Sequence, residues 1–99
     1  MNILITGAGK RIGKEIAINF AKNGATIILH YNHSKKEAEK TKKEISKYSR
    51  AVLIKANLEN SNSVKKLFLT AKKKVGKIHH LINCASIFEN DDLLKFNEK

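Results

Sequence analysis

The run Thr6-Gly7-Ala8-Gly9-Lys10-Arg11-Ile12-Gly13 directly follows an apolar stretch, Ile3-Leu4-Ile5, near the N-terminus. The apolar stretch is typical of a short buried strand, and the segment 11–22 is predicted to form a helix. A strand, a glycine-rich turn and a helix together present free backbone N–H groups, and the positive end of the helix dipole, to a phosphate. The first glycine allows a sharp turn, and the other two allow close approach of the backbone. The run therefore predicts a dinucleotide site.

Length and composition indicate one small domain. The 99 residues can bury a modest core, and no apolar run reaches the ~18 residues of a transmembrane helix. The N-terminus lacks a charged region followed by a long apolar run, so no signal peptide is expected. Cys84 is the single cysteine, which excludes an intrachain disulfide and fits a reducing cytoplasm. We therefore expect a cytoplasmic domain without a membrane segment.

The formal net charge of +11 raises the alternative of a polyanion-binding protein. Of the 20 basic residues, however, only Arg11 and Arg50 are Arg, and the others are Lys. Lys, Asn and Ile, all abundant here, share A/T-rich codons, so a biased genome explains the composition. The Lys residues are also scattered instead of alternating with aromatic residues, as a stacking platform for bases would require. The sequence therefore argues against nucleic acid as a partner.

Strand and helix signals alternate along the chain. Apolar, β-branched runs predict strands at residues 2–6, 26–31, 51–56 and about 78–83. Apolar residues at helical spacing predict helices at 11–22, about 34–47 and 64–75, and a further short helix is expected near residues 91–96. Connections of helix length between apolar strands imply parallel pairing with right-handed crossovers. The predicted fold class is α/β, a partial Rossmann fold whose parallel sheet of about four strands has the order 3-2-1-4 with flanking helices.

The same patterns predict local details of the first two helices. The first helix should end at Asn23-Gly24 and bury one face, made of Ile12, Ile16, Ala17 and Phe20. Ser34, with Glu37 three residues later, has the pattern of a capping box that opens the second helix. That helix carries only a thin apolar stripe, so it should lie on the surface; the stripe consists of Ala38, Ile45 and Tyr48.

Four motifs resemble one family. The glycine run is similar to the T-G-x-x-x-G-[IL]-G turn of the short-chain dehydrogenase/reductase superfamily, with Arg11 in place of the middle glycine. That Arg variant resembles the pteridine reductase group. Residues 30–34 resemble its H-Y-x-R-S segment after the second strand, residues 56–58 its D-[LV] segment beside the adenine, and residues 83–86 its N-N-A-[GS] segment after the fourth strand. Four matches in register identify residues 1–99 as the cofactor-binding N-terminal part of such a domain.

Three positions depart from the family pattern. His33 stands where the family has Arg, Asn57 where it has Asp, and Cys84 where it has a second Asn. These changes leave backbone contacts possible and weaken contacts made by side chains.

The resemblance also implies that the chemistry lies elsewhere. Family members are more than twice as long, and their catalytic Ser and Y-x-x-x-K lie beyond position 99. No Tyr followed four residues later by Lys lies in a suitable place, because Tyr31 and Tyr48 fall in the adenine half. We therefore expect a truncated protein that is inactive alone and contains no catalytic residue. The alternatives are the N-terminal half of a split reductase, completed by a separate C-terminal chain, and a non-enzymatic basic protein that binds polyanions.

The predicted cofactor is NADP(H). An acidic residue after the second strand would bind the ribose hydroxyls of NAD and repel a 2′-phosphate. None is present in residues 30–34, and Lys10 and Arg11 are expected nearby. The predicted cofactor-binding residues are Gly7, Gly9, Lys10, Arg11, Ile12, Gly13, Tyr31, Asn32, His33, Ser34, Asn57, Leu58, Asn83, Ala85 and Ser86.

Other reactive side chains have structural interpretations. The four His residues have no partners at metal-ligand spacing, and the neighbouring His79 and His80 should point to opposite faces of a strand, so no metal site is predicted. Cys84 matches a family Asn and has no identifiable activating base, so it should be inert. Asp91 and Asp92 are best explained as caps of the short helix that follows them.

The predicted sheet is incomplete. Two helices should cover one face and only one the other, and the fourth strand should form an open edge. Some apolar positions of the sheet should therefore stay in contact with water; the candidates are Ile3, Ile5, Ile28, Leu81 and Ile82. We expect marginal stability, with self-association or pairing to a C-terminal partner chain.

Overall fold

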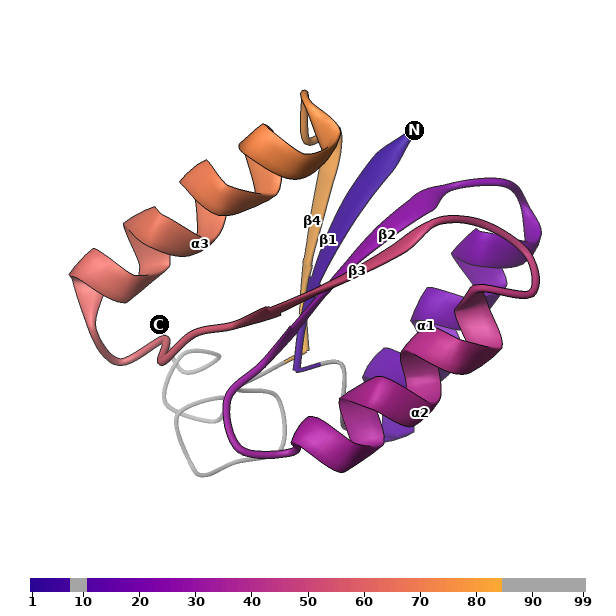
Figure 1. Cartoon of the computed structure of the whole chain (residues 1–99), viewed down its shortest axis with the longest axis horizontal. Coiled ribbons are helices and arrows are strands. Elements are labelled where there is room, and N and C mark those ends of the chain that lie inside the picture. Colours follow the sequence, from indigo (N-terminus) through magenta and orange to yellow (C-terminus); the bar gives the residue numbers. More distant parts are fainter. Residues whose placement is uncertain (8–10, 85–99) are drawn as a thin grey trace, which may run out of the picture.

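The computed structural model describes residues 1–7 and 11–84. In this part of the chain four strands and three helices alternate; their order is β1 (Asn2–Thr6), α1 (Arg11–Lys22), β2 (Thr26–Tyr31), α2 (Lys35–Ile45), β3 (Ala51–Lys55), α3 (Ser61–Val75) and β4 (His80–Asn83). The strands form one sheet in the order β3-β2-β1-β4 (Figure 1). The predicted α/β class and strand order are confirmed.

All strand pairs in the sheet are parallel. Ile3 of β1 is paired with Ile27 of β2 on one side and with His80 of β4 on the other. β2 continues the sheet outward, with Ile27 paired with Ala51 of β3. Because parallel strands point the same way, all four carboxyl ends lie at the same edge of the sheet. That edge is where open α/β sheets bind ligands.

The helices cover the two faces of the sheet unequally. α1 and α2 lie together on one face, and α3 lies alone on the other (Figure 1). The core under α1 and α2 consists of Ile3, Ile5, Ala17, Ala21, Ala25, Ile27, Leu29, Ile45 and Cys84. The core under α3 consists of Leu4, Ile28, Val52, Ile54, Ala56, Leu67 and Ala71. Successive side chains of each strand therefore alternate between the two cores, as a sheet covered on both faces requires.

The buried face of α1 differs from the predicted one. The fully buried residues are the small ones, Gly13, Ala17 and Ala21. Ile12 and Phe20 are 42% and 38% exposed, so assigning them to the buried face was wrong. Ile16 is partly buried against the core, as expected. The small residues allow the helix axis to approach the sheet closely, which turns the larger side chains at the margins of that face toward solvent.

The ends of the helices confirm some signals and correct others. Gly24, with a φ of 89°, follows α1 as predicted, and Gly76, with a φ of 85°, follows α3. Ser34 does occupy the N-cap of α2, but its side chain makes no capping hydrogen bond, so the capping box is not formed. Instead, Asn60 caps α3 by accepting hydrogen bonds from two backbone N–H groups. α2 ends at Ile45, earlier than expected, and the predicted helix at 91–96 lies outside the described residues.

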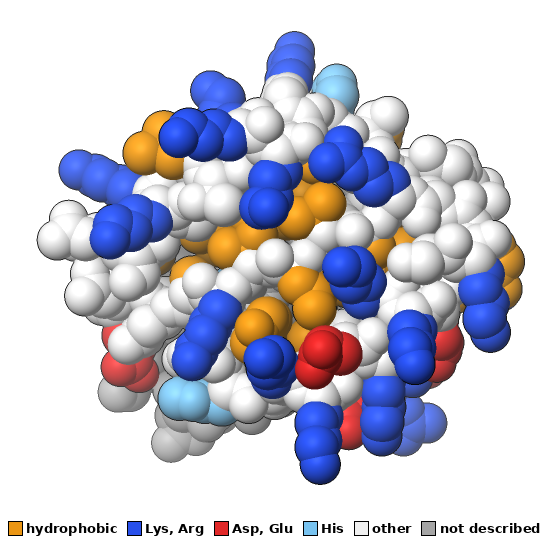
Figure 2. All heavy atoms as spheres, in the orientation of Figure 1, with side chains coloured by type: hydrophobic (Ala, Val, Ile, Leu, Met, Phe, Trp, Pro, Cys, Tyr) orange, Lys and Arg blue, Asp and Glu red, His pale blue; other side chains and the backbone are white. Residues whose placement is uncertain are grey.

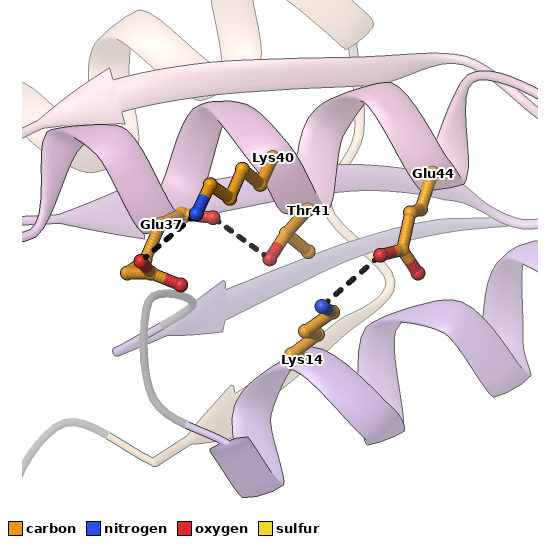
Figure 3. A network of polar contacts seen from close by, with 5 residues as sticks. All are labelled: Lys14, Glu37, Lys40, Thr41 and Glu44. Carbon is orange, nitrogen blue, oxygen red and sulfur yellow. Dashed lines mark hydrogen bonds and ion pairs between the residues drawn. The ribbon is translucent and has the colours of Figure 1, made fainter.

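Figure 3 shows one ion pair between α1 and α2 and two polar contacts within α2. The Lys14 ammonium lies 3.0 Å from the Glu44 carboxylate, bridging the two helices, and Lys40 lies 3.6 Å from Glu37 within α2. The hydroxyl of Thr41, which is 1% exposed, donates to the Glu37 carbonyl at 3.0 Å. Thr41 thus occupies the middle of the α2 stripe between Ala38 and Ile45. Tyr48, which was expected in that stripe, is 51% exposed.

The expectation that some apolar positions of the sheet stay in contact with water is confirmed at its edge. Ile3, Ile5 and Ile28 are fully buried, so they are not among those positions. Three helices are enough to cover the apolar side chains of the three strands β1 to β3. Exposure is concentrated at the edge strand β4, where Leu81 is 50% exposed and Ile82 is half-buried. β4 is also shorter than predicted and starts at His80.

The face of the molecule drawn in Figure 2 is rich in basic side chains. Figure 2 shows Lys and Arg side chains spread over the visible face, with apolar side chains exposed between them. Among the described residues, no helix has the length and hydropathy that crossing a membrane requires.

The packing predicts which α2 residue matters for stability. Ile45→Ala should lower the free energy of unfolding by about 2–5 kcal/mol, because it leaves a cavity in the core under α1 and α2. Lys14→Ala removes only an exposed ion pair and should change it by less than about 1 kcal/mol. Urea unfolding of both variants measures the difference. Equal losses would contradict this assignment of the core.

Candidate functional site

The predicted cofactor residues converge on the carboxyl edge of the sheet. Gly7 follows β1, Asn57 lies just beyond β3, and Asn83 ends β4. Residues 31–34 lead from the last residue of β2 to α2, and residues 11–13 form the first turn of α1. Gly9, Lys10, Ala85 and Ser86 lie outside the described residues. The predicted residues that are described therefore surround one edge.

Gly7 has the conformation that the sequence predicted for it. Its φ of 73° is in the left-handed region that favours glycine. Its backbone N–H donates to Nδ1 of His30 at 3.2 Å, so that N–H is used within the protein. Gly7 therefore contributes the sharp turn after β1, and phosphate donors must come from residues further along.

His30 is the most enclosed polar side chain at this edge. It is 2% exposed and lies near the end of β2. Its Nε2 lies 2.7 Å from the Ala56 carbonyl, and its Nδ1 accepts from Gly7. Since Nδ1 accepts, Nε2 carries the proton and donates, which is the neutral form of the ring. Burial lowers the pKa of His30, and the hydrogen bond to Ala56 opposes that shift only in part.

The ends of β1 and β4 are joined by a second polar contact. The Thr6 hydroxyl donates to Oδ1 of Asn83 at 2.7 Å, and the backbone N–H of Cys84 donates to the Thr6 carbonyl at 3.1 Å. Cys84 is 1% exposed and belongs to the core under α1 and α2. Burial raises the pKa of its thiol, which disfavours the reactive thiolate. Both features support the prediction that Cys84 is inert.

The first turn of α1 is suited to an anion. It contains no acidic residue, and Arg11 and Ile12 are exposed at the helix start. Gly13 is buried against the sheet, where a larger side chain would hold the helix away. The N-terminal N–H groups of a helix attract negative charge, and the Arg11 guanidinium adds to that attraction.

The segment after β2 also lacks acidic side chains. Tyr31 and Asn32 are half-buried, whereas His33 and Ser34 are exposed. Tyr31 and Lys35 do have the Y-x-x-x-K spacing, but Tyr31 ends β2 and Lys35 begins α2. The two residues therefore do not lie one turn apart on a helix, and the spacing alone assigns them no catalytic role.

The segment after β3 forms a short turn before α3. The Asn57 side-chain oxygen accepts from the backbone N–H of Glu59 at 3.0 Å, and the Asn57 backbone carbonyl accepts from Asn60 at 3.2 Å. Asn57 itself is exposed, whereas Leu58 packs against the core under α3. Asn57 thus shapes the turn from an exposed position.

The sequence interpretation missed the link between His30 and Ala56. A polar residue inside an otherwise apolar strand is the signal that could have drawn attention to His30. The partner is a backbone carbonyl of a distant segment, and no side-chain pattern marks it. Within the described ranges, no group of three His, Cys, Asp or Glu residues could hold a metal ion.

Comparisons with known proteins agree with this geometry. A family model described as short chain dehydrogenase matches residues 1–99. A hydroxynaphthalene reductase-like protein of Metarhizium brunneum is 42% identical over 81 residues, covering 81% of this chain and 30% of that relative. A short-chain type dehydrogenase/reductase of Picea abies is 33% identical over 94 residues, covering 88% of this chain and 35% of that relative. The crystal structure of a dehydrogenase from Burkholderia cenocepacia with bound NADP gives a TM-score of 0.80 at 36% identity, covering 83% of this chain and 32% of that protein.

The chain belongs to the short chain dehydrogenase family. It spans about a third of the length of the relatives just described. Their names do not include a pteridine reductase, so the narrower resemblance remains a prediction.

The neutral form of His30 predicts a pH dependence of stability. Because burial lowers its pKa in the folded chain below the ordinary value of 6.5, the unfolded chain binds the extra proton first as pH falls. The contribution of His30 to stability should be complete above pH 6.5 and decline below it, until the pH has passed the folded pKa. Urea unfolding between pH 5 and pH 8 measures this. His30→Phe, which cannot titrate, should remove that part of the slope, and an unchanged slope would contradict the assignment.

The burial of Cys84 predicts slow alkylation. Native protein treated with iodoacetamide should remain unmodified, and the thiol should react fully once the chain is unfolded in urea, because access and thiolate formation then both increase. Mass spectrometry of the intact chain measures the fraction modified. Equal rates in native and unfolded protein would show that Cys84 is accessible.

Proposed function

We propose that this chain is the NADP(H)-binding N-terminal part of a short-chain reductase domain. The observation that carries the proposal is the carboxyl edge of the sheet, where the first turn of α1 presents Arg11 and the segment after β2 contains no acidic side chain. An acidic residue after β2 would favour NAD over NADP. The related Burkholderia cenocepacia structure with bound NADP supports the same cofactor.

In this proposal each segment at the edge contacts a different part of the nucleotide. The turn after β1 and the start of α1 hold the pyrophosphate through Gly9, Lys10, Arg11, Ile12 and Gly13, with Gly7 shaping the turn. Residues 31–34 surround the 2′-phosphate, and Asn57 and Leu58 lie beside the adenine. Asn83, Ala85 and Ser86 border the nicotinamide side. The bound cofactor would supply the hydride, and these residues bind and orient it.

We further propose that residues 1–99 do not reduce a substrate by themselves. The chain spans about a third of its relatives, and its Tyr31 and Lys35 do not share a helix. A proton donor and an orienting group are both needed for carbonyl or imine reduction. Two resemblances suggest different substrate classes. The Arg11 motif favours a pterin, and the relatives' names favour a hydroxylated naphthalene. We also propose a reducing, cytoplasmic setting, which the single cysteine of the chain fits.

A second possibility is a split reductase, which the exposed edge strand favours. Leu81 on β4 is 50% exposed, and a hollow beside it is lined by apolar and basic side chains from α3 and the chain before β4. A strand or helix from a C-terminal partner would cover this edge.

The cofactor proposal predicts a preference that can be measured. Isothermal titration should show tighter binding of 2′,5′-ADP than of 5′-AMP, because the 2′-phosphate gains contacts with basic groups. Arg11→Ala should weaken 2′,5′-ADP binding by about tenfold or more, since a hydrogen bond to a charged group contributes about 1.5–3 kcal/mol. Arg50→Ala is the matched control, because Arg50 precedes β3 at the opposite edge of the sheet. Equal affinity for the two nucleotides would contradict the NADP(H) assignment.

The catalytic proposal predicts that the purified chain oxidises no NADPH in the presence of a pterin, a quinonoid pterin or a hydroxynaphthalene. The absorbance of NADPH at 340 nm measures this, and a rate that rises in proportion to added chain would overturn the proposal.

The edge strand predicts association. Ultracentrifugation should detect self-association of the chain at micromolar concentrations, and Leu81→Lys should reduce it by placing a charge at the exposed edge. A dilute monomer with one sharp unfolding transition, unaffected by Leu81→Lys, would instead indicate that these residues form an independent domain.

A further inference from the structure

The His30 side chain connects two segments that the nucleotide proposal uses separately. Its Nδ1 accepts from Gly7, where the chain leaves β1, and its Nε2 donates to Ala56, just after β3. Gly7 begins the turn assigned to the phosphates. Ala56 precedes the pair assigned to the adenine. One ring therefore spans the sheet edge from β1 to β3 through β2.

Core packing alone does not call for a histidine here. His30 is paired with Ile54 of β3, and the other residues of β2 at buried positions are Ile27, Ile28 and Leu29. An apolar side chain would fill the space without the cost of burying two ring nitrogens, which is offset only when both are hydrogen-bonded. Both nitrogens of His30 are bonded to backbone, so the ring acts as a fixed spacer between two main-chain segments.

The contact with Gly7 adds a second hydrogen bond to the peptide between Thr6 and Gly7, whose carbonyl accepts from the Cys84 N–H at 3.1 Å. Gly7 has no side chain and a φ of 73°, so side-chain sterics do little to hold the chain beyond this peptide. Together the two hydrogen bonds fix the orientation of the peptide plane, and with it the direction in which the chain enters the turn. A small change in that direction would displace several phosphate donors together, because they follow one another along the backbone.

We propose that His30 is a positioning residue that sets the distance between the phosphate-binding turn and the adenine-side segment of the nucleotide site. This inference rests on the proposed function, since it concerns the same site. It assigns His30 no contact with the nucleotide. His30 acts through Gly7 on the phosphate side and through Ala56 on the adenine side.

Two substitutions separate the two hydrogen bonds. In His30→Asn the side-chain oxygen can take the place of Nδ1 and accept from Gly7, but the side chain is too short to reach Ala56. In His30→Gln the amide nitrogen can take the place of Nε2 and donate to Ala56, but no acceptor faces Gly7. Thr41→Val is the matched control, because it removes a buried hydrogen bond of 3.0 Å from the middle of α2, away from the sheet edge.

The probes are NADP⁺, which carries the pyrophosphate, and 2′-AMP, which lacks it. His30→Gln should weaken NADP⁺ binding by about tenfold, the loss expected for one hydrogen bond, and leave 2′-AMP binding within about twofold of the unsubstituted chain. His30→Asn should weaken binding of both probes, because the adenine-side segment is released. Thr41→Val should lower the unfolding temperature and leave both affinities unchanged.

A purely structural role for His30 gives a different result. Both His30 variants would then unfold at lower temperature, as Thr41→Val does, but bind the two probes like the unsubstituted chain, and the inference would be overturned. Failure of the proposed function is distinguishable, because the unsubstituted chain would then bind neither probe.

The geometry itself has an independent readout. The ¹⁵N NMR spectrum of the imidazole should show a protonated Nε2 and an unprotonated Nδ1 without any nucleotide present. The opposite tautomer, or a rapidly exchanging ring, would overturn the positioning role even if nucleotide binds.

Discussion

The parallel alignment of β1 between β2 and β4 is the constraint on which the rest of the structure depends. It brings all four carboxyl ends to one edge and requires each connection to cross over a face of the sheet. The crossover helices then bury that face, and α1 begins directly beside the end of β1. The glycine turn, the start of α1 and the segments after β2 and β3 meet because the strands are parallel. An antiparallel sheet would distribute them between two edges.

The polar contacts at that edge keep the strand ends in register. Thr6 and Asn83 join β1 to β4, while Gly7, His30 and Ala56 join β1 to β2 and β3. These contacts lie at the margin of the hydrophobic core, where the backbone leaves the sheet. They hold in place the surface that we assign to the nucleotide, so stability and the shape of the site are linked at the same residues.

Much of the fold could be predicted from sequence because the strands β1 to β3 each have a continuous apolar run and the helices have apolar residues at helical spacing. The bounds of β1, α1 and β2 follow directly from those patterns. The buried face of α1 could not be predicted from hydrophobicity, because the close approach of α1 to the sheet selects Gly13, Ala17 and Ala21 over Ile12 and Phe20. The absence of a capping bond at Ser34 likewise depends on the backbone angles before α2. The candidate site was assembled from motifs, whereas the His30 link depends on which distant carbonyl lies opposite the ring.

The central claim is that one edge of the sheet binds the nucleotide. Amide chemical-shift mapping of the chain with added NADP⁺ tests it most directly. The account predicts that the shifts concentrate at residues 11–13, 31–34 and 57–58, and that the last turn of α3, with Lys72, Lys73 and Lys74, is unaffected. Shifts concentrated on the lysines of α3, or spread evenly over the basic surface, would contradict the account and indicate non-specific anion binding.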